Sequence, residues 1–101
     1  MSSFNKNRYF RTDAEINATA RKLVSYLRKL SRSRIAGTVT ADDAHRFLTR
    51  EGVQPEQVRT RLRFINMAFN NNSEYFYPVG EVQSTRPAAR GRMITEWAPT
   101  S

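Results

Sequence analysis

The residues best suited to chemistry in this sequence are arginines, and they gather in two short segments. Residues 55–70 read PEQVRTRLRFINMAFN, and residues 84–93 read STRPAARGRM. A guanidinium group donates parallel hydrogen bonds, so it holds a phosphate or the edge of a guanine in a way that an ammonium group cannot. The arginines concerned are Arg59, Arg61, Arg63, Arg86, Arg90 and Arg92. Guanidinium groups gathered in this way are suited to binding a polyanion.

Catalytic chemistry finds little support in the sequence. His45 is the only histidine, and it stands close to Asp42 and Asp43. These residues could begin a metal or acid–base site, but the chain has no second histidine and no cysteine to complete it. The two aspartates have a simpler role as negative charges at the N-terminal end of a helix. No nucleophile motif or glycine-rich phosphate loop is present, so we expect no enzymatic activity, no metal and no cofactor.

Composition and charge narrow the partner and the compartment. At 101 residues we expect one domain, and a net charge of +8 favours nucleic acid or an anionic membrane surface as partner. No apolar run approaches the roughly 18 residues of a membrane-spanning helix. The N-terminal MSSFNKNRYF lacks the apolar core of a signal peptide. We therefore expect a cytoplasmic, nucleoid-associated protein of prokaryotic or viral type.

Periodicity predicts two helices in the first half of the chain. Thr12 and Glu15 have the spacing of a capping box, and apolar residues recur behind them at helical spacing. We therefore expect a first helix over residues 13–30. The segment 37–39 is short and contains β-branched residues, so a brief strand is expected there. Thr40 is expected to cap a second helix.

A third helix is expected to start at Pro55, because proline is favoured at the first helical position. Spacings of four, three and four predict its core-facing residues: Val58, Leu62, Ile65 and Phe69. The opposite face then holds Glu56, Thr60, Arg63 and Met67, flanked by Gln57, Arg59 and Phe64. Exposed Phe64 and Met67 would contact the hairpin, a second subunit or thymine methyl groups.

The last third of the chain reads as a β-hairpin. Two segments, 81–85 and 93–97, are strand candidates. The loop 86–92 between them is too polar to pack in the core. The predicted organisation has three parts: a basic arm at 1–11, a domain at 12–97 and a frayed tail at 98–101.

The order of helix, short strand, helix, helix and hairpin resembles the winged helix-turn-helix superfamily. The likeness is carried by GTVTADDAHRFLTREGVQPEQVRTRLRFIN at 37–66 and by the loop 86–92. Ala44 and Gly52 are eight positions apart, where the shortest helix-turn-helix pattern has four, so a longer second helix or turn is implied. The resemblance implies an α+β fold whose C-terminal hairpin is a wing. It also implies that the third helix enters the major groove of double-stranded DNA.

Residue types suggest how the third helix would read a duplex. Arg59 and Arg63 suit guanine, Gln57 suits adenine, and the Thr60 methyl group suits thymine. A phosphate contact is predicted at Arg61, and at Asn66 and Asn70 unless these two simply cap the end of the helix. The plain alternative is an ordinary solvated helix face.

Loop arginines add further predicted contacts. Arg90-Gly91-Arg92 is short enough to lie in a narrow minor groove, with Arg86 beside it at the tip. Arg32 and Arg34 follow the first helix and could meet the DNA backbone. A flexible, solvated turn explains either group equally well.

The interpretation favoured by the sequence is sequence-selective binding of double-stranded DNA, as a monomer or a homodimer, by a small transcription regulator. The main alternative is the origin-binding domain of a replication initiator from a phage, plasmid or mobile element. A protein-interaction module is a third possibility. Membrane-surface binding is least favoured, because the apolar stripe of the first helix is needed to fill the core.

Overall fold

The first helix is the longest element of the fold. The computed structural model describes residues 12–70 and 74–100, and its helix α1 spans Asp13–Ser33. The predicted cap is confirmed, since the Thr12 hydroxyl accepts a hydrogen bond from the Glu15 amide at 3.1 Å. The helix runs three residues beyond the predicted end because Ser31 is buried and donates to the Gly37 carbonyl at 2.6 Å. That bond fixes the last turn of α1 against the loop that follows.

The second helix, α2 (Ala41–Arg50), begins at a complete capping box. Thr40 is its N-cap, as predicted, and the Asp43 carboxylate accepts from the Thr40 amide at 2.9 Å. In place of the short strand predicted at 37–39, Val39 forms an isolated antiparallel bridge with Trp97.

The third helix differs from its prediction in both start and register. α3 spans Val58–Ile65 and continues as a π turn, η1 (Asn66–Asn70). Pro55 lies in the preceding turn instead of starting the helix. Val58 and Leu62 were predicted to face the core, but they are 55% and 47% exposed.

Ile65 and Phe69 are buried, as predicted, but the other core residues of this segment come from a neighbouring face of the same helix. Phe64 is fully buried, which contradicts its predicted exposure, and Met67 is partly buried against the core. A π turn winds fewer degrees per residue than an α-helix, so Phe69 returns to the buried face. There its ring stacks on Trp97, with centroids 5.0 Å apart.

The hairpin is confirmed, with longer strands than predicted. β1 (Phe76–Gln83) pairs antiparallel with β2 (Met93–Pro99), from Phe76 opposite Pro99 to Gln83 opposite Met93. The tail was predicted to fray, which is wrong for residues 98–100. Ala98 and Pro99 belong to β2, and the Thr100 amide donates to the Tyr75 carbonyl at 3.0 Å. The predicted arm at 1–11 lies outside the described residues.

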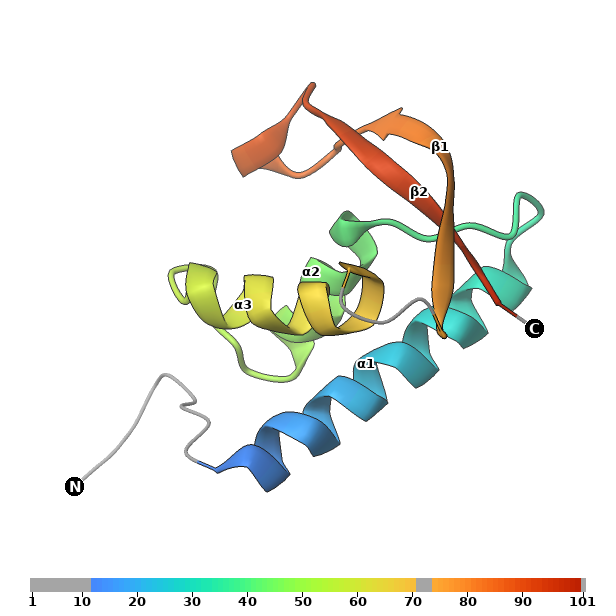
Figure 1. Ribbon diagram of the computed structural model, residues 1–101. Helices are drawn as coiled ribbons and strands as arrows, with labels where there is room; N and C mark the ends of the chain where they lie inside the picture. The colour runs from blue at the N-terminus through green and yellow to red at the C-terminus, as the bar shows by residue number, and fades with distance from the viewer. Residues whose placement is uncertain (1–11, 71–73, 101) are drawn as a thin grey trace.

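The fold is therefore α+β, with three helices followed by a two-stranded antiparallel hairpin. Figure 1 shows the hairpin crossing the helices, with its open end beside the C-terminal part of α1 and its tip above α2 and α3. The buried residues between these layers include Leu23, Leu27, Leu48 and Phe76. Among the described residues, no helix has the length and apolar content needed to cross a membrane.

Candidate nucleic-acid interface

The exposed face of α3 carries two arginines. Arg59 and Arg63 are both exposed, as predicted, and no ion pair holds either of them among the described residues. The buried stripe of α3 is displaced by one residue from its predicted position. Val58 and Leu62, which were predicted to face the core, therefore lie on the exposed face with the two arginines. This face therefore combines two free guanidinium groups with two aliphatic side chains.

Arg61 was predicted to contact phosphate from the surface, and this placement is wrong. The residue is only 3% exposed. Its guanidinium group makes five hydrogen bonds, which end on the carbonyls of Gln54 (3.2 Å), Val53 (2.5 Å) and His45 (3.3 Å), on the Thr49 hydroxyl (2.6 Å) and on the His45 ring (3.1 Å). Arg61 thus joins α3 to α2 and to the loop between them.

The remaining predicted residues of this helix have local roles. Gln57 is the N-cap residue, and its side-chain oxygen accepts from the Gln54 amide at 2.8 Å. Thr60 is partly buried. Asn66 is exposed, and its side-chain oxygen accepts from Asn70 at 2.7 Å. Of the polar residues assigned to base contacts, only the two exposed arginines stand fully on the outer face.

The hairpin tip is bound to the first turn of α2 through Asp42. This carboxylate accepts from the Ser84 hydroxyl at 2.8 Å and from the Thr85 amide at 2.8 Å, with a longer contact to the Thr85 hydroxyl at 3.3 Å. Arg86 Nε lies 3.4 Å from the same carboxylate. Burial opposes the ionisation of Asp42, but these hydrogen bonds and the Arg86 charge outweigh it, so the pKa of Asp42 lies below its ordinary value.

The tip also closes on itself. The Ser84 amide donates to the Arg92 carbonyl at 2.7 Å, and the loop between them contains a short 3-10 turn, η2 (Pro87–Ala89). Gly91 has a φ of 84°, which only glycine adopts without strain. The loop 86–92 is polar, as expected, and backbone hydrogen bonds join Ala89 to Arg86 and Arg92 to Ala89 within it.

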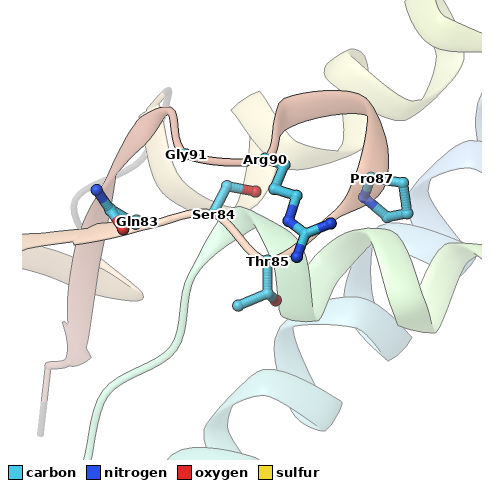
Figure 2. A pocket seen from close by; sticks show the side chains of 6 residues that line it. All are labelled: Gln83, Ser84, Thr85, Pro87, Arg90 and Gly91. Carbon is cyan, nitrogen blue, oxygen red and sulfur yellow. The ribbon is translucent and has the colours of Figure 1, made fainter.

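Two of the tip arginines are exposed. Arg90 and Arg92 lie on the outer surface, whereas Arg86 is partly buried against α2. Figure 2 shows the Arg90 side chain bending back over the loop toward Thr85. Gln83, Ser84, Pro87 and Gly91 line the same hollow, of about 560 Å³.

The two arginines that follow α1 differ in their surroundings. Arg32 is exposed. Arg34 binds both oxygens of Asp43, at 2.7 and 2.8 Å, and it also donates to the Thr38 carbonyl. Asp43 accepts from Arg46 as well. Its hydrogen bonds and charged neighbours overcome its burial and lower its pKa, so Asp43 is a structural anion and Arg34 is committed to it.

A second cleft separates α2 from the hairpin tip. It has a volume of about 310 Å³ and is lined by three segments: His45, Arg46 and Thr49 of α2, Pro55 and Arg61 of the turn and helix that follow, and Arg86, Pro87 and Ala88 of the tip. The pKa of His45 falls to about 4, because the ring is buried and because Arg86 and Arg61 oppose its protonation more than Asp42 favours it. Burial and the Arg86 charge likewise lower the pKa of Arg61, against a weaker effect of Glu56.

Sequence reasoning missed Asp42 as the anchor of the tip and Arg61 as a buried connector. Asp42 was assigned only to the helix terminus, and its partners lie 42 and 43 residues away, so no local pattern could reveal them. Within the described ranges, no cluster of side chains suited to holding a metal ion is found. No protein-family model, curated protein or solved structure matches this chain.

Proposed function

We propose that this chain is a winged helix-turn-helix domain that binds double-stranded DNA with sequence preference. In this arrangement α3 enters the major groove through its exposed face. The hairpin is the wing, and its tip lies on an adjacent minor groove or on backbone phosphates.

The topology supports the proposal. Three helices are followed by an antiparallel hairpin, and Val39, just before α2, bridges to Trp97 of β2. The bridge gives β2 a pairing partner on each side, as in a small sheet behind the helices. This order and pairing are compatible with a winged domain.

One observation carries the proposal: Arg59 and Arg63 are exposed on the outer face of α3, while a tip bearing exposed Arg90 and Arg92 is fixed to α2. Fixing the tip sets the distance between the two basic elements before any ligand arrives. A preordered pair of elements loses less conformational entropy on binding than a mobile pair. A duplex offers charge to both elements at once.

The test uses duplexes selected from a random pool, with binding followed by fluorescence anisotropy. Arg59→Ala and Arg63→Ala should each weaken the selected duplex by about 1–3 kcal/mol, and a scrambled duplex by less. Arg21→Ala, an exposed arginine of α1, is the charge-matched control and should have a small effect on both duplexes. If about four phosphates are neutralised, log K should fall against log salt with a slope of about −4.

Losses no larger than that of Arg21→Ala, or a slope near zero, would contradict the proposal. Exposed Val58 and Leu62 favour a second candidate function, which is protein contact through α3 between two copies of the chain. Leu62→Gln separates the two functions. Loss of self-association in sedimentation with duplex binding intact would assign the aliphatic pair to a protein interface.

A further inference from the structure

We propose that the cleft between α2 and the hairpin tip, lined by His45, Arg46, Arg61 and Arg86, is a binding site for a phosphoryl group. We infer that its occupant is one backbone phosphate of duplex DNA. This inference rests on the proposed function and goes beyond it, because it assigns a phosphate to the cleft between α2 and the tip instead of to the exposed arginines.

The first argument is the charge balance around the cleft. Three guanidinium groups, those of Arg46, Arg61 and Arg86, line the cleft, and no carboxylate of the described residues belongs to its lining. Asp43 forms ion pairs with both Arg34 and Arg46, and Asp42 forms an ion pair with Arg86. The cluster therefore holds more positive than negative charge at a place that is partly shielded from water.

Arg61 contributes most to this imbalance. All five of its hydrogen bonds end on neutral acceptors, no carboxylate in residues 12–70 or 74–100 forms an ion pair with it, and the charge of Glu56 acts on it more weakly than burial and Arg86 do. A buried cation without a counterion is costly, because burial removes its hydration without supplying an opposite charge. An anion in the cleft would supply that charge.

Arg86 provides an unused donor at the same place. Its Nε is buried and makes no hydrogen bond within the described part of the chain, although it lies 3.4 Å from Asp42. At that distance the carboxylate attracts the guanidinium group without saturating it. The Arg86 side chain also lines the cleft, so its positive charge is available to an anion bound there, although the buried Nε itself is not.

His45 adds a donor whose protonation state is fixed by its neighbour. A guanidinium group only donates, so the His45 Nδ1 that lies 3.1 Å from Arg61 must be the accepting nitrogen. The neutral ring consequently carries its proton on Nε2, and the ring lines the cleft. The cleft thus offers an imidazole N–H and guanidinium groups, a combination suited to the oxygens of a phosphoryl group.

The position of the cleft favours a DNA phosphate over a free anion. Pro87 and Ala88 of the tip form one wall, and Pro55, in the turn that leads into α3, belongs to the lining. The cleft therefore lies between the two elements proposed to enter adjacent grooves. The backbone that separates two grooves must pass between these elements.

The first measurement uses the single histidine as a reporter of the cleft. The His45 ring protons are followed by NMR between about pH 7 and about pH 3, with inorganic phosphate or with chloride at equal ionic strength. Phosphate in the cleft should raise the titration midpoint by about one pH unit, since an opposite charge nearby stabilises the protonated ring. Arg86→Gln should abolish most of this rise, whereas the charge-matched Arg21→Gln should retain it.

The second measurement replaces single phosphates of the selected duplex by neutral methylphosphonates. One position should weaken binding of the wild-type protein by about tenfold or more, the effect expected for loss of a charged hydrogen-bonding group. The same methylphosphonate should weaken duplex binding of the Arg86→Gln variant by less than about twofold. It should weaken binding of the Arg21→Gln variant as much as that of the wild type. Circular dichroism of each variant checks that the fold is retained.

The outcomes separate this inference from the proposed function. A phosphate-dependent rise at His45 together with one phosphate coupled to Arg86 supports the inference. Duplex binding in which no phosphate is coupled to Arg86 overturns it and leaves the proposed function standing. A rise at His45 with no duplex binding overturns both the proposed function and the DNA occupant, and assigns the cleft to a free anion. No response in either measurement overturns the site itself.

Discussion

Replacing Asp42 by alanine should release the hairpin tip and destabilise the whole domain. The carboxylate is 5% exposed, and it receives two short hydrogen bonds, from the Ser84 hydroxyl and the Thr85 amide, both at 2.8 Å. A hydrogen bond to a charged group contributes about 1.5–3 kcal/mol to stability. The longer contacts to the Thr85 hydroxyl and to Arg86, at 3.3 and 3.4 Å, contribute less.

The net loss depends on which donors water can reach after the substitution. Ser84 is only 3% exposed, so its hydroxyl would stay buried without a partner, whereas Thr85 is exposed and would be hydrated. We therefore expect Asp42→Ala to lower the free energy of unfolding by about 2–4 kcal/mol, less than the full sum of the bonds. For a domain of this size such a loss lowers Tm by roughly 10 °C or more. Asp42→Asn keeps one acceptor and should lose about half as much.

The assay is urea unfolding followed by circular dichroism, together with hydrogen exchange of the Thr85 amide. Asp13→Ala is the matched control, because Asp13 is an exposed carboxylate in the first turn of α1. It should cost about 0.3–1 kcal/mol through the helix dipole alone. In a double-mutant cycle, Asp42→Ala and Ser84→Ala should couple by about 1–2 kcal/mol. The reasoning is refuted if Asp42→Ala lowers the free energy of unfolding no more than Asp13→Ala does, and if the losses from Asp42→Ala and Ser84→Ala are additive in the double variant.

Two further predictions concern the cleft. The pKa of His45 is about 4, below its ordinary 6.5, so the unfolded chain binds the proton first as the pH falls. Stability should therefore be complete above about pH 6.5 and decline toward pH 4 by at most about 3 kcal/mol, and His45→Gln should flatten this decline in urea titrations across that range. Arg61→Lys should cost about 2–4 kcal/mol in the free energy of unfolding, because an ammonium group cannot reach all five acceptors, whereas exposed Arg63→Lys should stay within about 0.5 kcal/mol. Equal unfolding midpoints for these two lysine variants would contradict the assigned role of Arg61.

Features that depend on neighbouring residues could be predicted from the sequence. The caps at Thr12 and Thr40 are confirmed, because each cap bonds to an amide two or three residues away. The hairpin was predicted because two strand candidates flank a short polar loop. Its bounds were not, since β1 begins at Phe76 and ends at Gln83, and β2 continues to Pro99.

The register of α3 could not be predicted in the same way. An arginine occupies a place on the buried face that spacing rules assign to an apolar residue. Burial of Arg61 is possible only because acceptors from α2 and from the loop at Val53 converge on it. The position of those acceptors is a property of the tertiary structure. The exposure of Val58 and Leu62 follows from the same rotation of the helix.

The two aspartates at the start of α2 show how a tip of polar sequence is attached to the helices. Asp43 bonds backward to Thr40 and Arg34, which holds the loop that enters the helix. Asp42 bonds outward to the tip, which lies far away in sequence. One helical turn therefore fixes both its own approach and the hairpin. In the proposed complex this turn, instead of the exposed face of α3, sets the spacing of the DNA contacts. Substitutions at Asp42 should accordingly weaken duplex binding even though the carboxylate itself would repel a phosphate.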